Sequence, residues 1–145
     1  MELTMLDIAP GQSAMAADIA PLIRTLRPGL TRDGFAEFAA EAHQQGLVFT
    51  AAYDERRRCL AVATHRVLAT SRGRLLLVDD LVTAPEARSA GIGGRLLTEL
   101  EERARQAGCV RIELDSGLSN HGAHRFYHAR RMAVVAFHFA RDLHG

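Results

Sequence analysis

Three glycines stand within four positions of the sequence, and an arginine precedes them: Arg88, then Gly91, Gly93 and Gly94. Glycine tolerates positive φ and has no Cβ, so successive backbone N–H groups can point into one concavity and hold phosphate oxygens. The apolar run from Leu96 predicts a helix directly after the glycines, and the free N–H groups of a helix N-terminus favour the same ligand. The pattern predicts a phosphate-binding loop, with a tight strand-to-helix turn as the alternative.

Two common phosphate-binding motifs do not fit these residues. A Walker A loop needs a lysine, and all 18 basic side chains of the chain are arginine. A dinucleotide fingerprint needs GxGxxG after the first strand of a βαβ unit. Gly91, Gly93 and Gly94 have a different spacing and follow three predicted antiparallel strands. The first motif is excluded and the second is disfavoured.

Apolar patterning predicts the elements around this loop. Apolar or alternating runs predict strands at Leu3–Ile8, Leu47–Tyr53, Cys59–Thr70, Leu75–Thr83, Val110–Leu114 and Ala133–Ala140. Helical spacing predicts helices from an N-cap at Ser13 to about Leu26, from an N-cap at Thr31 to Gln45, from the glycines to Gly108, and over about Gly122–Arg130. The strand, loop, helix and strand around the glycines form a crossover, so the flanking strands should be parallel neighbours. We expect an α/β chain: one domain over residues 1–145, with a mixed sheet flanked by helices.

Composition disfavours several classes of partner. A net charge of +1 gives no positive field of the size that nucleic-acid binders use, so no nucleic-acid partner is expected. No apolar run is long enough to span a membrane and no signal segment opens the chain, so we expect a cytoplasmic protein without a membrane partner. Cys59 and Cys109 lack the spacing of a zinc site or a disulfide framework, and no bound metal is expected.

Two segments resemble motifs of the GNAT N-acetyltransferase superfamily. Arg88–Gly93 is similar to its acetyl-CoA signature, in which Arg or Gln is followed by two residues, Gly, one residue, and Gly or Ala. Asn120–Tyr127 resembles the family segment Asn-x-x-Ala-x-x-Phe-Tyr, although Arg131-Met132 stands where Gly-Phe usually follows. The resemblance covers about Leu75–Met132. It implies the GNAT fold and transfer of an acetyl group from acetyl-CoA to a primary amine of a small molecule, by direct attack in a ternary complex.

The same resemblance implies which residues bind the cofactor. The pyrophosphate of CoA would lie on the backbone of the glycine loop, and the pantetheine arm would pair with the end of the preceding strand. Asn120 would contact the cofactor arm, cap its own helix, or do both. The implied cofactor-binding residues are Leu81, Val82, Thr83, Arg88, Ser89, Ala90, Gly91, Ile92, Gly93, Gly94, Arg95, Asn120 and Tyr127.

Two residues are the candidates for catalysis. Tyr127 matches the family's tyrosine acid, since a phenol is protonated at neutral pH and can donate to the departing sulfur. The alternative for Tyr127 is a core aromatic residue beside Phe126. Asp79 is the candidate base, acting through water, and its alternative is a solvated or ion-paired carboxylate. Because adjacent strand residues point to opposite faces, only one of Asp79 and Asp80 is expected to face the acceptor.

The candidates for acceptor binding are Asp80, Asp115 and His124. These acids favour a small cationic amine, while His124 also fits an ordinary surface or packing histidine. Two other functions stay open: a non-catalytic acyl-CoA-binding or regulatory module, and an acetyltransferase directed at protein or RNA. The expected partners are acetyl-CoA and a small amine, and a homodimer that meets at the last predicted strand is left open.

Overall fold

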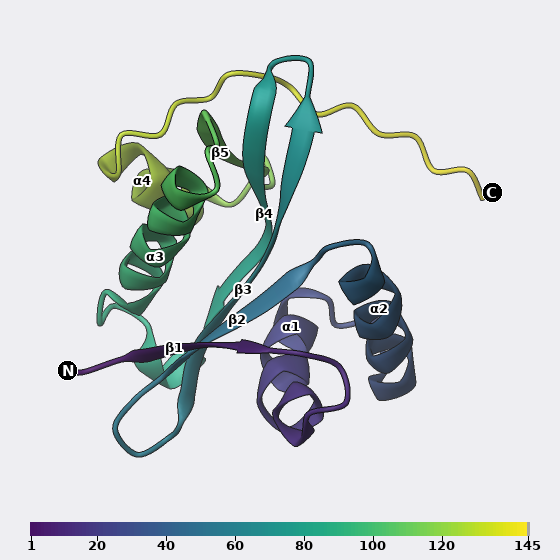
Figure 1. The fold of residues 1–145 in the computed structure, drawn as a ribbon, viewed down its shortest axis with the longest axis vertical. Coiled ribbons are helices and arrows are strands. Elements are labelled where there is room, and N and C mark those ends of the chain that lie inside the picture. The colour runs from purple at the N-terminus through teal and green to yellow at the C-terminus, as the bar shows by residue number, and fades with distance from the viewer. Residues whose placement is uncertain (145) are drawn as a thin grey trace. The chain divides into compact units, whose positions relative to one another are not determined.

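A computed structural model describes residues 1–144 as two compact units, Met1–Glu113 and the residues from Leu114 onward. Figure 1 shows the elements in chain order. The strands are β1 (Thr4–Ile8), β2 (Val48–Tyr53), β3 (Cys59–Thr70), β4 (Gly73–Thr83) and β5 (Arg111–Leu114). The helices are α1 (Ala20–Leu26), α2 (Arg32–Gln44), α3 (Ile92–Gln106) and α4 (His121–Ala129), with short helical turns at Met15–Ile19 and Pro85–Ala87. No helix in this described part is long and apolar enough to cross a bilayer.

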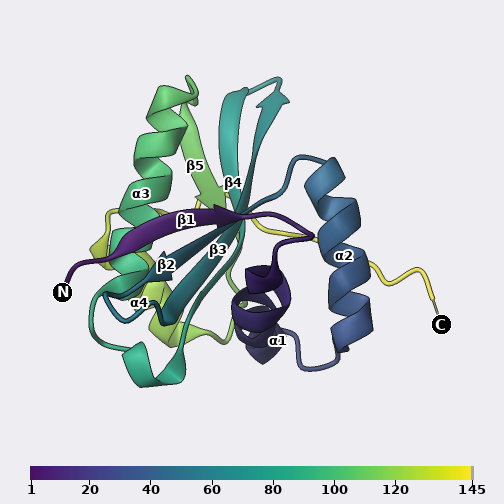
Figure 2. The same cartoon turned by 60° about the horizontal axis from the view of Figure 1, so that its bottom comes forward.

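The strands form one sheet in the order β1-β2-β3-β4-β5, in which the first four are antiparallel neighbours. The N–H of Val110, just before β5, donates to the carbonyl of Arg74 near the start of β4, at 2.8 Å. Figure 2 shows the β5 arrow pointing away from the β3–β4 turn, as β4 does. β5 is therefore parallel to β4. The predicted crossover and the mixed sheet are both confirmed.

Helices cover both faces of the sheet in the first unit. α1 and α2 lie on one side and α3 on the other (Figure 2). α3 buries one stripe at helical spacing, made of Ile92, Leu96, Leu97, Leu100 and Ala104. The predicted N-cap of α2 is confirmed, because Thr31 Oγ1 accepts a hydrogen bond from the N–H of Gly34 at 3.0 Å.

The first predicted helix is present but differs in detail. Helical backbone runs from Ser13 to Leu26, with a π-helical segment at Met15–Ile19, and no side chain caps this segment or α1, so the N-cap predicted at Ser13 is wrong. Pro21 explains the wider turn. It has no N–H to donate to the preceding turn, and its ring crowds the carbonyl that such a bond would use.

The strand predicted at Ala133–Ala140 is wrong, because residues 133–144 form neither helix nor strand. Its alternating apolar side chains are exposed instead, by 70% for Val135, 81% for Phe137 and 92% for Phe139. Alternation indicates a preference for extended backbone, whereas a strand also needs a neighbour that takes up its N–H and C=O groups. Within the described residues no strand pairs with this segment.

A β-bulge interrupts the pairing of β3 with β4. Thr64 is opposite Asp80, but the next residue, His65, is opposite Val78, so Asp79 is an extra residue without a partner on β3. A bulge bends its strand and re-aims the side chains around it. β4 is therefore bent at the two aspartates, and it pairs with β3 again from Asp80 to Thr83.

A polar network is buried between the sheet and α3, next to the bulge. Thr50 Oγ1 lies 2.8 Å from His65 Nε2 and donates its proton to Asp7 at 2.8 Å. The hydroxyl has one proton, so Nε2–H of a neutral imidazole donates to Thr50. Arg103 of α3 closes the network through Asp7 (2.8 Å) and Glu99 (2.8 Å). Burial, with a contribution from the Arg103 guanidinium, lowers the pKa of His65 to about 4.

This network predicts a loss of stability in acid. Between pH 6.5 and 4 the unfolded chain protonates His65 while the folded chain does not, so the free energy of unfolding falls by on the order of 3 kcal/mol as the pH drops through that window. In urea titrations, His65→Gln should lose less stability than the wild type on acidification from pH 7 to pH 4. The exposed His43→Gln is the matched control and should keep the wild-type slope. Parallel curves for His65→Gln and the wild type would contradict the buried neutral histidine.

Candidate active site

A cavity of about 480 Å³ lies where the bulge of β4 meets the helices of the first unit. β4 contributes two carboxylates, the end of α1 and the loop after it contribute an arginine and two aliphatic side chains, and α2 contributes an aromatic ring. The lining residues are Ile23, Arg27, Leu30, Phe38, Asp79 and Asp80. The cavity therefore combines an apolar wall with three charged groups, which is a common composition for a small-molecule site.

The bulge brings both aspartates to this cavity. In a regular strand neighbours alternate between faces, and the bulge removes that alternation here, so the reason for expecting only one of Asp79 and Asp80 at the acceptor does not hold. Which of them faces the acceptor stays a prediction, and the two carboxylates have different surroundings.

Asp80 is held by its neighbours. Its side chain is only 9% exposed, its Oδ1 accepts from Arg27 Nη2 at 3.0 Å, and its Oδ2 accepts from Thr64 Oγ1 at 2.7 Å. Both oxygens are therefore occupied. The two donors orient the carboxylate and compensate for its removal from water.

Asp79 keeps an oxygen for a ligand. Its side chain is 32% exposed, and its Oδ2 pairs with Arg66 Nη2 at 2.9 Å. Oδ1 has no hydrogen-bond partner among the described residues. A carboxylate with one oxygen fixed and one free can accept a hydrogen bond from an amine or from a water molecule.

The glycine loop leads directly into the start of α3. Gly91 caps the helix in the left-handed conformation, with φ 75°, and no side chain caps the first turn. The N–H groups of Ile92, Gly93 and Gly94 have no intrahelical acceptor at that position, and the first turn contains no acidic residue. Residues 88–91, which precede these donors in the chain, are exposed. An anion would be stabilised there by the N–H groups and by the helix dipole.

Backbone strain and close packing shape this loop. Ser89 has a φ of 69°, a region that a residue with a Cβ seldom occupies and that costs about 1–2 kcal/mol. A Cβ on Gly93 would lie 3.4 Å from Thr83 Oγ1, so α3 starts close against the end of β4. The loop is thus held directly beside the last residues of β4.

The two arginines of the loop differ. Arg95 Nη1 donates to the carbonyl of Met1 at 2.7 Å, which directs its guanidinium toward the N-terminus. Arg88 is exposed, and its guanidinium has no hydrogen bond or ion pair within residues 1–144. Arg88 is therefore the loop cation that is available to a phosphate.

The end of β4 has one free edge. Leu81, Val82 and Thr83 pair with β3 on one side. On the other side, β5 starts beside Arg74 and is 4 residues long, so it ends before it reaches them. Their outward backbone groups are open to an extended ligand, as expected for a strand that parts from its neighbour.

The remaining predicted residues lie in the second unit. Asn120 caps α4, since its Oδ1 accepts from the N–H of Ala123 at 3.2 Å. His124 Nε2 lies 2.8 Å from the carbonyl of Gly117, and Asp115 pairs with His138 at 3.0 Å.

Tyr127, on α4, packs edge-on against Phe126 at 5.3 Å between ring centroids. Burial raises the pKa of the Tyr127 phenol, so the group is protonated throughout the neutral range. It can therefore donate a proton but is a poor base.

Sequence patterns did not single out the three residues that hold the two aspartates: Arg27, Thr64 and Arg66. Arg66 is the one arginine of β3, which is a usable signal, because a charged side chain in a strand needs a partner. Arg27 precedes Pro28-Gly29 and carries no local signal, because its contact with Asp80 spans 53 positions of the chain.

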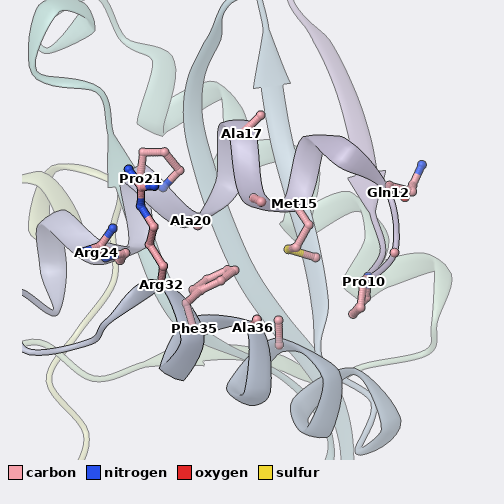
Figure 3. A pocket seen from close by; sticks show the side chains of 13 residues that line it. Pro10, Gln12, Met15, Ala17, Ala20, Pro21, Arg24, Arg32, Phe35 and Ala36 are labelled. Carbon is pink, nitrogen blue, oxygen red and sulfur yellow. The ribbon is translucent and has the colours of Figure 1, made fainter.

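A larger cavity of about 620 Å³ lies between α2 and the α1 region and contains none of the predicted site residues (Figure 3). Five of its thirteen lining residues are alanine, and its charged residues are Arg24 and Arg32. No aspartate, glutamate or histidine lines it. Within the described residues, no three histidine, cysteine or acidic side chains gather in a way that could hold a metal ion.

Comparison of the sequence with known proteins identifies relatives. The profile of the Acetyltransferase (GNAT) family matches residues 18–132. An uncharacterized N-acetyltransferase of Bacillus subtilis, YhdJ, is 34% identical over 113 residues, which cover 77% of this chain and 79% of that protein. The aminoalkylphosphonate N-acetyltransferase of Salmonella typhimurium is 38% identical over 66 residues, or 46% of this chain and 43% of that protein.

Solved structures share the fold at low sequence identity. The aminoglycoside N-acetyltransferase AAC(6')-Iy, in complex with CoA, superposes with a TM-score of 0.82 at 14% identity, over 98% of this chain and 95% of that one. An acetyltransferase of Trypanosoma brucei superposes with a TM-score of 0.77 at 22% identity, over 98% and 100%. With the family profile matching most of its length and the mixed sheet shared with these structures, this chain belongs to the GNAT family and is an acyltransferase.

Proposed function

We propose that this protein transfers the acetyl group of acetyl-CoA to a primary amine of a small molecule, by direct attack in a ternary complex. The observation that carries the proposal is the layout of β4. Asp79 and Asp80 line a cavity, the next residues have a free edge, and the strand then leads into a loop with unpaired N–H groups. The end of β4 and the loop after it could thus bind an amine at one end and a phosphate at the other.

The proposed cofactor-binding site fits acetyl-CoA. The first-turn N–H groups of α3 and the free guanidinium of Arg88 suit a pyrophosphate, and the open edge of Leu81–Thr83 suits the amide-containing pantetheine arm. AAC(6')-Iy, which shares the fold, is described with CoA bound. Bound there, acetyl-CoA would supply the activated acyl group.

A small acceptor is supported by the size of the cavity and by the relatives. A volume of about 480 Å³ is in the ordinary range for small-molecule sites. The names of two similar proteins, an aminoglycoside and an aminoalkylphosphonate N-acetyltransferase, both describe small amines.

The proposed chemistry uses one base and one acid. The neutral amine attacks the thioester carbonyl, so a C–N bond forms, the C–S bond breaks, and an N-acetyl amine and free CoA result. Asp79 takes the proton of the ammonium group through water, using its free Oδ1. Tyr127 is the proposed donor of a proton to the sulfur, because its raised pKa keeps the phenol protonated.

Ligand binding tests the proposed acetyl-CoA site. In thermal unfolding with acetyl-CoA, CoA, ATP and NAD in parallel, acetyl-CoA and CoA alone should raise the midpoint, since a ligand at about a hundredfold its Kd stabilises by about 2.7 kcal/mol. Arg88→Gln should weaken acetyl-CoA binding by roughly tenfold, as expected for the loss of one charge-assisted contact. The control is Arg32→Gln, an exposed arginine away from the loop. A midpoint of thermal unfolding that rises with ATP or NAD but not with CoA would contradict the proposed acetyl-CoA site.

Substitution of the proposed acid and base tests catalysis. Asp79→Asn and Tyr127→Phe should each lower kcat by roughly 10²-fold or more while leaving the Kd for acetyl-CoA unchanged, because each removes one proton-transfer group. Steady-state kinetics with a panel of amines and calorimetric binding of acetyl-CoA would measure both. Asp33→Asn, an exposed acid at the start of α2, is the control. If neither variant changes kcat, or if the wild type turns over with no amine, the non-catalytic module becomes the better description.

We further propose that the chain forms a homodimer in which Ala133–Ala140 of one copy adds as a strand to the free edge of β5 in the other. The segment has alternating apolar side chains that are exposed, and β5 is an edge strand. Exposed strands and edges of this kind favour pairing with another chain. Two phenylalanines from each copy, at about 150–250 Å² each, would bury on the order of 1,000 Å², the size that a specific interface needs.

Light scattering after gel filtration tests the dimer. The wild type should be a dimer at micromolar concentration, and Phe137→Glu combined with Phe139→Glu should be a monomer with an unchanged fold. His144→Glu adds a charge near the same segment without removing an apolar group, and it should remain dimeric. A monomeric wild type whose residues 133–140 are nevertheless protected from hydrogen exchange would show that the segment folds onto its own chain.

A further inference from the structure

Each carboxylate at the acceptor cavity already has a cationic partner, which limits the kind of amine that fits. Asp80 is paired with Arg27 and Asp79 with Arg66, at 3.0 and 2.9 Å. Arg27 is itself one of the lining residues, whereas Arg66 lies outside the lining. An acceptor that is only a cation would therefore compete with these ion pairs and would lie beside the Arg27 guanidinium.

Arg27 is placed by its backbone rather than by its side chain. It ends α1, its N–H donates to the carbonyl of Ile23 at 3.1 Å, and its carbonyl accepts from the N–H of Leu30 at 2.9 Å. Both neighbours in these bonds also line the cavity. The guanidinium therefore starts from a fixed point at the cavity wall.

The guanidinium of Arg27 retains free donors. Nη2 donates to Asp80, the side chain is 60% exposed, and neither Nε nor Nη1 has a partner among the described residues. A guanidinium carries five N–H donors in a planar fork, a geometry that matches the oxygens of a carboxylate or a phosphonate. Arg27 can thus bind an anionic group while it still holds Asp80.

We propose that the acceptor is an amine that also carries an anionic group a few carbon atoms away, and that Arg27 is the residue that selects it. The ammonium group is recognised by the free Oδ1 of Asp79 and the anionic oxygens by Arg27, while the apolar wall covers the short carbon chain between them. The inference rests on the proposed function. It adds the class of acceptor and a specificity-determining residue that takes no part in the chemical step.

Four acceptors with similar chains test this proposal: 3-aminopropylphosphonate, 4-aminobutyrate, butylamine and 1,4-diaminobutane. We expect the wild type to show a kcat/KM at least tenfold higher for the two anionic amines than for butylamine, with 1,4-diaminobutane lowest. The phosphonate and the carboxylate arms show which anion the fork prefers. Arg27→Gln should remove the preference mainly by raising KM, and Arg27→Glu should reverse it in favour of the diamine.

Two controls distinguish a change in acceptor preference from a loss of folding stability. Arg32→Gln, which lies on α2 and does not line this cavity, should keep the wild-type preference. The midpoint of thermal unfolding should be the same for Arg27→Gln and the wild type, since the side chain is mostly exposed.

The possible outcomes distinguish this inference from the proposed function. Equal acetylation of all four amines, or a preference that Arg27→Gln leaves unchanged, would overturn the inference and leave the acetyltransferase activity standing. If the wild type acetylates none of them, calorimetric titration in the presence of CoA decides. Binding of the anionic amines that depends on Arg27 would support the inference while the proposed reaction fails, and no binding would overturn both.

Discussion

The extra residue in β4 is the constraint on which the site depends. Without the bulge, Asp79 and Asp80 would point to opposite faces of the sheet, and only one could reach the cavity beside α1 and α2. The bulge also bends β4 just before the residues whose other edge is free. That free edge has a separate cause, since β5 ends before it reaches Leu81–Thr83.

A bulge removes regular pairing, and the surrounding structure compensates for it. The residue opposite the interruption, His65, belongs to the buried network with Thr50 and Asp7, which Arg103 of α3 completes. Thr50 Oγ1, His65 Nε2 and both oxygens of Asp7 each have a hydrogen-bond partner, and such pairing is what lets a partly buried polar network stabilise a fold. Hydrogen bonds to α3 therefore fix one face of the sheet near the bulge. The cavity beside α1 and α2 lies on the opposite face.

Local patterns explain why some of this could be predicted and the rest could not. The cap at Thr31, the apolar stripe of α3 and the glycine loop depend on residues close in sequence, and all three were predicted. The bulge depends on the register of two strands, and the contact of Arg27 with Asp80 joins positions 53 apart. The segment Ala133–Ala140 has the composition of a strand but forms none. A strand needs a second segment to pair with, and the composition of one segment does not show whether that partner exists.

The two aspartates show how identical neighbours acquire different tasks. Asp80 is nearly buried, and its two donors, Thr64 and Arg27, compensate the carboxylate for its removal from water. Its hydrogen bonds are therefore committed to the structure, where it orients Arg27. Asp79 is more exposed, and only its Oδ2 has a partner. A water molecule can therefore bind Oδ1 and exchange a proton with it at little energetic cost. The burial of one carboxylate thus leaves the other free to interact with a ligand.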